Sequence, residues 1–159
     1  LRFFYYLQLH MKNSHKYYMA LAMEEAELSV SKGSFPFAVV VVNELGEVVW
    51  KDHDRVEELN DPGAHGEVNA IRSLCAKFGT LSLEKFTFYT TSEPCPTCLT
   101  YCIKAKVGSI FYGAKTEKIA SLPIPAEEIA SRSKKYPIEV TGGILEEECL
   151  AQRERLLEN

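Results

Sequence analysis

The chain has 159 residues, of which 46% are hydrophobic and 25% charged, and its formal net charge at pH 7 is −4. This length is enough for one domain with a substantial core and too short for two full domains. The acidic balance gives the surface no general attraction for nucleic-acid phosphates, so a polynucleotide partner would have to be held by local patches.

The cysteine content and the opening residues bear on where the protein works. Five cysteines are an odd number, which disfavours a disulfide scaffold and predicts a reducing, cytoplasmic setting. The opening run LRFFYYLQLH is far shorter than the ~20 apolar residues of a membrane span and has no small-residue cleavage site. We therefore expect no membrane anchor, an N-terminal extension of unknown role over residues 1–12, and one domain over residues 13–159.

Periodic hydrophobic patterns predict helices and strands in alternation. Helical patterns lie at 14–32, 61–79, 95–107, 125–133 and 142–158. Strand patterns, rich in β-branched and aromatic residues, lie at 37–42, 47–51, 85–91, 108–114 and 136–141. Ser14 or Asn13 suits the first helix as N-cap, and Asp61 suits the second. The alternation predicts a three-layer α/β/α sandwich around a five-stranded mixed sheet.

Three cysteines lie close together in TTSEPCPTCLTYC, residues 90–102. Cys95 and Cys98 are three residues apart on the first turn of an expected helix, so both thiols can face one point. The helix N-terminus also lowers the pKa of a cysteine there. Cys102 lies about 10 Å further along the helix axis, whereas a zinc ion holds its sulfurs at about 2.3 Å. Cys102 and Cys75 are therefore interpreted as buried core residues.

Two thiolates need further ligands, and His65 in DPGAHGE is the histidine that follows turn residues at a helix start. His53, in an acidic loop, is expected to be solvated. Residues two apart point to different sides of a regular helix, so His65 and Glu67 can converge only at a frayed helix start. His65, Cys95 and Cys98 would leave one tetrahedral position for water, as in a catalytic zinc site. A lone CxxC would indicate a redox pair or half a structural finger, and the HxE pattern is what favours zinc catalysis.

The pattern HGE, followed after about thirty residues by EPCPTC, is typical of zinc-dependent base deaminases. On these motifs the chain resembles the cytidine deaminase-like superfamily from its first helix onward. Guanine deaminases and tRNA adenosine deaminases have segments similar to HGEVNAIR and FYTTSEPCPTC. The form HGE is similar to that of fungal cytosine deaminase, and the closing IEVTGGILEEEC is similar to the tRNA enzymes. The resemblance implies the cytidine deaminase-like fold, a Zn²⁺ cofactor and a homodimer.

The resemblance also implies roles for individual residues. Zinc lowers the pKa of its bound water toward about 7, and Glu67 would take the proton and deliver protons to the ring and to the leaving amino group. The alternative for Glu67 is a helix-start acid that interacts with the dipole. The residues expected to bind substrate are Phe37, Ala38, Asp54, Ala64, Ser92, Glu93 and Pro94.

Two departures from the family pattern bear on the substrate. The sequence PFAV stands where most relatives have PFGA, so that Ala38 and Val39 add bulk beside the pocket. Asp54 stands where an asparagine usually precedes the zinc histidine by eleven residues, and a carboxylate accepts hydrogen bonds without donating any. The surrounding acids are interpreted as a solvated loop whose charge opposes a phosphate backbone. They are Asp52, Glu57, Glu58 and Asp61.

The sequence therefore predicts hydrolytic deamination of a small nucleobase or nucleoside, with guanine or a related aminopurine as the first candidate and ammonia as a product. The alternative substrate is adenosine in tRNA, favoured by the C-terminal motif but disfavoured by the acidic loop. A third hypothesis is a non-catalytic, zinc-stabilised interaction module. Glu67 argues against that module, because such a protein would not need it.

Overall fold

The computed structural model describes residues 13–158, and the expected N-terminal extension over residues 1–12 lies outside the described residues. The helices are α2 (His15–Ser31), α3 (Val56–Leu59), α4 (Gly66–Phe78), α5 (Pro96–Lys104), α6 (Ala126–Arg132) and α7 (Glu146–Leu157). The strands are β1 (Ala38–Val42), β2 (Val48–His53), β3 (Thr87–Ser92), β4 (Ser109–Ala114) and β5 (Glu139–Thr141). None of the helices in this part of the chain is long and apolar enough to cross a membrane.

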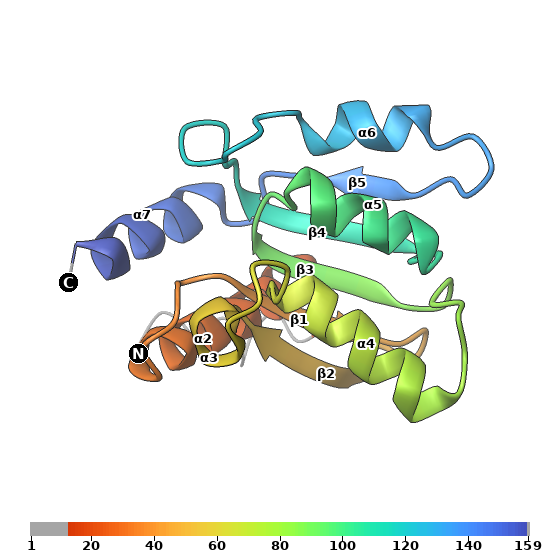
Figure 1. The fold of residues 1–159 in the computed structure, drawn as a ribbon, viewed down its shortest axis with the longest axis horizontal. Coiled ribbons are helices and arrows are strands. Elements are labelled where there is room, and N and C mark those ends of the chain that lie inside the picture. Colours follow the sequence, from red (N-terminus) through yellow and green to blue (C-terminus); the bar gives the residue numbers. More distant parts are fainter. Residues whose placement is uncertain (1–12, 159) are drawn as a thin grey trace.

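The strands form one mixed sheet in the order β2-β1-β3-β4-β5. Strand β1 pairs antiparallel with β2 and with β3, whereas the β3–β4 and β4–β5 pairs are parallel. Helices cover both faces (Figure 1), with α2 and α7 on one side and α4, α5 and α6 on the other. The predicted three-layer fold with a five-stranded mixed sheet is confirmed.

Burial on both faces explains the run of four valines in β1, because a strand covered on two sides needs apolar residues at every position. Val39 and Val41 belong to the core beneath α4 and α5, while Val40 and Val42 belong to the core beneath α2. Val39 is therefore a core residue, and the expectation that it adds bulk beside the pocket is wrong.

The helix starts differ in how well the sequence predicts them. Ser14 caps α2 as expected, since its hydroxyl accepts a hydrogen bond from the backbone N–H of Tyr17 at 3.1 Å. Helix α4, however, begins at Gly66, and its N-cap is His65, four residues after the expected cap Asp61. The Asp61 carboxylate instead accepts from the backbone N–H of Gly63 at 2.8 Å and closes a turn of its own. This turn keeps His65 outside the regular helix.

The acidic segment that follows Trp50 is only partly the solvated loop that the sequence predicts. Strand β2 continues to His53, and both Asp52 and His53 are buried. Arg55 Nε donates to Asp52 at 2.8 Å, and His53 Nδ1 lies 2.6 Å from a carboxylate oxygen of Glu25 on α2. The expectation that His53 and Asp52 are solvated is wrong, because both side chains are buried, Asp52 beside Arg55 and His53 beside Glu25.

The remaining acids of this segment behave more nearly as expected. Glu57 and Glu58, on the short helix α3, are exposed, and Asp61 is half-buried.

Helix α7 lies directly against the backbone of β4, and Gly113 permits this approach. A Cβ atom on Gly113 would lie 2.4 Å from Cys149 Sγ and 2.7 Å from the carbonyl oxygen of Thr91. We predict that Gly113→Ala lowers the free energy of unfolding by about 1–3 kcal/mol through overpacking. Gly63→Ala is the control, because its Cβ would meet no atom closer than Asp61 Oδ1 at 3.3 Å. Urea unfolding measures both variants, and equal losses would contradict the packing argument.

Candidate active site

The three expected metal ligands come from the starts of α4 and α5, which lie side by side on one face of the sheet. His65 and Cys95 are the two N-cap residues and share one backbone conformation, with φ −70° and ψ 157° for His65 and φ −65° and ψ 163° for Cys95. Cys98 lies within the first turn of α5. Two helix starts with the same geometry thus direct three ligand side chains to one point.

The distances among these side chains fit a zinc ion. His65 Nδ1 lies 3.6 Å from Cys95 Sγ and 3.3 Å from Cys98 Sγ, and the two sulfurs are 3.4 Å apart. A tetrahedral zinc with the usual bond lengths holds such atoms about 3.5–3.8 Å apart, whereas a disulfide bond measures about 2.05 Å. The group is therefore positioned to bind a metal through three protein atoms, with a fourth position left open.

The other two cysteines of this region stay away from the ligands. Cys102 is fully buried in the core beneath α4 and α5, as predicted. Cys75 is half-buried and packs against the same core.

The ligand side chains are electrostatically coupled in the metal-free chain. The hydrogen bond between the two thiols lowers the pKa of Cys95 to about 4. The same hydrogen bond raises the pKa of Cys98 well above the ordinary thiol value. Hydrogen bonding to Cys95 raises the pKa of His65 to about 9. At neutral pH the group therefore contains one thiolate, one thiol and one imidazolium. Zinc binds thiolates and neutral imidazole, so its binding must displace protons from Cys98 and His65.

Glu67 is the second residue of α4 and lines the same cavity as His65 and Cys95. Residues two apart in a regular helix point to different sides, but His65 is the N-cap and lies outside the helix, whereas Glu67 lies in its first turn. Both side chains can therefore face the same cavity. Burial raises the pKa of Glu67 above the usual glutamate value. A carboxyl group with a raised pKa is suited to accept and return a proton near neutral pH.

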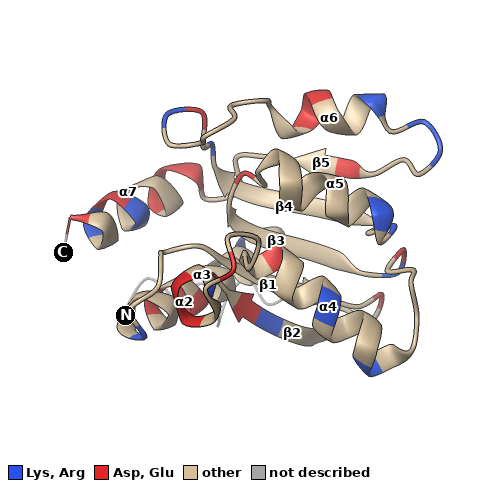
Figure 2. Ribbon diagram, viewed as in Figure 1, with Lys and Arg blue, Asp and Glu red and all other residues tan. Residues whose placement is uncertain are grey.

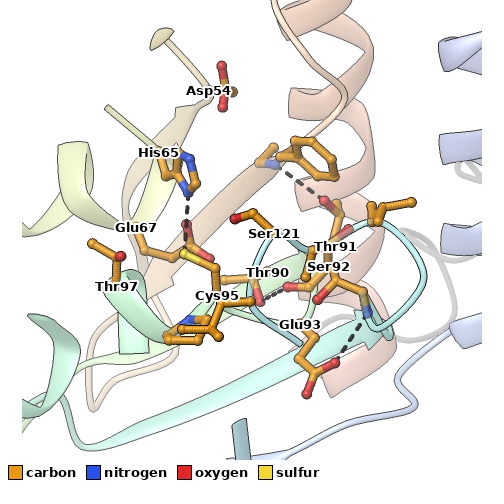
Figure 3. A pocket seen from close by; sticks show the side chains of 17 residues that line it. Asp54, His65, Glu67, Thr90, Thr91, Ser92, Glu93, Cys95, Thr97 and Ser121 are labelled. Atoms are coloured by element: carbon orange, nitrogen blue, oxygen red, sulfur yellow. Dashed lines mark hydrogen bonds between the residues drawn. The ribbon is translucent and has the colours of Figure 1, made fainter. Parts of the chain in front are cut away.

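A cavity of about 300 Å³ opens beside the ligands (Figure 3). Five of the residues expected to bind substrate line it, namely Phe37, Ala38, Asp54, Ser92 and Glu93. The other two lie elsewhere: Ala64 is fully buried, and Pro94 lines a small neighbouring cavity.

Asp54 follows the end of β2 and is 3% exposed. Its backbone N–H donates to the carbonyl of Phe37 at 2.9 Å, and its carboxylate accepts from the backbone N–H of Val56 at 3.1 Å. Burial raises the pKa of the Asp54 carboxyl. Its position at the cavity wall agrees with the expected role in substrate binding, although that role stays a prediction.

Several residues that line the cavity are not predicted from the sequence. Thr90 and Thr91 come from β3, where the Thr91 hydroxyl accepts from the backbone N–H of Ala38 at 3.2 Å and the Thr90 hydroxyl donates to the carbonyl of Ser92 at 2.8 Å. A second group comes from α5 and from the loop after β4, and comprises Pro96, Thr97, Thr116, Ile119, Ala120, Ser121 and Leu122. The loop has no periodic pattern, and its two prolines indicated only a connection.

We predict that zinc binding at pH 6 releases about two protons per ion, one from His65 and one from Cys98, because Cys95 is already ionised. Proton release in weakly buffered solution, titrated with zinc, measures this number. The Cys102→Ala variant is the matched control and should bind one zinc with the same proton release. Zinc loss in that variant, together with zinc retention in Cys98→Ala, would contradict the assignment of ligands.

Comparison with known proteins agrees with this geometry. Residues 12–114 match the model of the cytidine and deoxycytidylate deaminase zinc-binding region. A tRNA-specific adenosine deaminase from Bacillus subtilis is 34% identical over 133 residues, which cover 83% of this chain and 81% of the relative. This relative supports the alternative substrate, adenosine in tRNA, better than guanine.

Two solved structures show the same fold. One comes from a study of A-to-I editing by tRNA:A34 deaminases at the wobble position of transfer RNA. It has 28% identity and a TM-score of 0.75, and the match covers 85% of this chain and 97% of the other. The second is a guanine deaminase from Bacillus subtilis with 32% identity and a TM-score of 0.63, covering 77% of this chain and 78% of the other. The chain belongs to the cytidine and deoxycytidylate deaminase family and is a zinc-dependent deaminase with the cytidine deaminase-like fold.

Proposed function

We propose that this deaminase removes the exocyclic amino group of a purine by hydrolysis, and that adenosine in tRNA is its first candidate substrate. The proposal rests on the observation that Glu67, His65 and Cys95 line one cavity of about 300 Å³, which is large enough for a single base. The choice of tRNA is supported by the relatives named as tRNA adenosine deaminases. The homodimer and the cytoplasmic setting stay predictions.

The residues of the cavity divide the reaction between them. When bound by His65, Cys95 and Cys98, zinc would lower the pKa of a coordinated water to about 7. Glu67 would accept one proton of the attacking water and transfer it to a ring nitrogen. It would then take the second proton from the oxygen that is now bonded to the ring carbon and deliver it to the amino group, which leaves as ammonia. The ring carbon gains an oxygen as it loses the nitrogen, so the product carries a carbonyl group.

The walls of the cavity orient the base. The backbone beside Ser92 would accept hydrogen bonds from the amino group, since a carbonyl oxygen has two lone pairs and the Thr90 hydroxyl occupies one. Phe37 and Leu122 offer apolar surface to the faces of the ring. These contacts would hold the reacting carbon beside Glu67.

A free aminopurine such as guanine is the second candidate, and two observations favour it. Asp54 presents an acceptor-only carboxylate to the cavity, which suits a base edge rich in N–H donors. Figure 2 shows acidic residues on α3, which begins two residues after Asp54, and their charge repels phosphates.

Basic residues lie in the loop between β4 and α6, which also lines the cavity, so a tRNA would have to approach over that loop.

The Glu67→Gln variant tests the chemistry. The amide keeps the shape of the side chain but cannot carry the proton, so we expect turnover to fall by about 10²–10⁴-fold with unchanged zinc content. Ammonia release and metal analysis on the same preparation measure the two quantities. Near-normal turnover in this variant would contradict the role of Glu67.

Ammonia release from the zinc-loaded protein distinguishes the two substrates. We expect release from a tRNA anticodon stem-loop containing adenosine, with a rate that falls as salt rises, and little release from free guanine. Release from guanine alone would select the second candidate.

The Asp54→Asn variant gives an independent test of the same choice. If guanine is the substrate, loss of the charged acceptor should lower kcat/KM for guanine by about 10- to 100-fold. If adenosine in tRNA is the substrate, an amide that donates and accepts should leave the rate unchanged or raise it. Matched measurements on guanine and on the stem-loop, in both proteins, decide between the outcomes.

A further inference from the structure

We propose that Glu93 is a positioning residue whose carboxylate ties down both ends of the loop 116–125, so that this loop forms a fixed roof over the cavity. We call residues 116–125, between β4 and α6, the roof loop. The effect on catalysis rests on the proposed function, whereas the tie itself is a property of the fold.

The carboxylate of Glu93 contacts the first residue of the roof loop and the residue that follows its last one. One oxygen accepts from the backbone N–H of Thr116 at 3.2 Å, and the other accepts from the backbone N–H of Ala126 at 2.9 Å. Glu93 is only 8% exposed. Figure 3 shows the carboxylate directed away from His65 and Glu67, toward the loop. The side chain therefore serves the loop, and only the remainder of the residue faces the cavity.

The roof loop supplies one complete wall of the cavity. Ile119, Ala120, Ser121 and Leu122 all line it. Ile119 and Leu122 are 49% and 53% exposed, so apolar surface stands open at the cavity. A flat aromatic ring bound beside Glu67 would cover this surface, which places the roof loop against the substrate.

A second buried side chain holds the residue that precedes the roof loop. Arg153 of α7 donates to the carbonyl of Lys115 at 2.9 Å and to the hydroxyl of Ser92 at 3.2 Å. Arg153 is 7% exposed. Its guanidinium thus joins α7, the wall at Ser92 and the start of the roof loop. Glu93 and Arg153 thus both hold the first end of the loop, and Glu93 also holds the second end.

Hydrogen exchange of the zinc-loaded protein tests the tie directly, because the two amides that donate to Glu93 are observable. In Glu93→Gln the amide group can accept from one backbone N–H but presents its own N–H₂ to the other. We expect exchange in a peptide covering 115–126 to become about 10-fold faster or more, since hydrogen bonds to charged groups are the stronger ones. Exchange in a peptide from α4 should not change.

Glu127→Gln is the matched control. It makes the same carboxylate-to-amide change one residue after Ala126, but its carboxylate accepts from the Tyr112 hydroxyl rather than from the ends of the loop. This variant should leave exchange of the 115–126 peptide and basal activity unchanged. Equal acceleration in both variants would show general loosening of α6 and overturn the proposal.

Kinetics separate positioning from simple structural support. With a confirmed substrate, Glu93→Gln should raise KM more than it lowers kcat, with unchanged zinc content. If Glu93→Gln does not fold, Glu93→Asp replaces it, because the shorter side chain keeps the charge but draws the carboxylate back from the Thr116 and Ala126 amides, and faster exchange is expected in the 115–126 peptide there too.

The two proposals fail in different ways. Unchanged exchange in Glu93→Gln, or in Glu93→Asp where it stands in, overturns the tie even in an active deaminase. Faster exchange in a protein that deaminates no purine supports the tie and overturns only the proposed function.

Discussion

The convergence of two helix starts on one point is the constraint on which the site depends. A tetrahedral metal accepts ligand atoms only about 3.5–3.8 Å apart, so α4 and α5 must begin within a few ångströms of each other. Parallel pairing of β3 with β4 places α5 as the crossover on the same face of the sheet as α4. The cores on both sides of β1 hold this arrangement rigidly. The geometry of the ligands is therefore a consequence of the sheet order.

The N-cap conformation determines which side chains meet at this point. At His65 and Cys95 the backbone is extended; the Cys95 thiol accepts from the backbone N–H of Cys98, whereas the His65 side chain makes no capping hydrogen bond. The first turn that follows contributes a second functional group in each case, Glu67 in α4 and Cys98 in α5. One helix start thus carries an expected ligand and the proposed proton carrier, and the other carries two expected ligands. The two starts are alike in backbone and differ only in what their side chains do.

Residue spacing was enough to predict that His65, Cys95 and Cys98 lie together, because the position of each is determined locally at a helix start. The positions of Cys95, Cys98 and His65 relative to a helix start follow from turns that a few neighbouring residues determine. Asp61 shows the limit of that reasoning, since a good capping residue closed a turn of its own and the helix began later. Local patterns therefore identified the site but placed one of its helices too early.

Long-range pairing is what the sequence could not predict. His53 is buried because Glu25, 28 residues earlier, offers it a carboxylate. The loop after β4 lines the cavity although its sequence shows no periodic pattern, and its ends are contacted by Glu93, which follows β3, and by Arg153 of α7. Periodicity reports which face of an element is covered, and it carries no information on such contacts.

The same contacts explain how one metal centre can serve different substrates within a family. The expected ligands and Glu67 all come from two helix starts. The cavity walls come from elements held separately, Asp54 from the end of β2 and the loop 116–125 from its ties to Glu93 and Arg153. A change in either wall alters which base edge and which backbone can approach, while the distances among His65, Cys95 and Cys98 stay the same. We therefore expect discrimination between a free base and a base in tRNA to depend on these walls, with Asp54 as one of the residues involved.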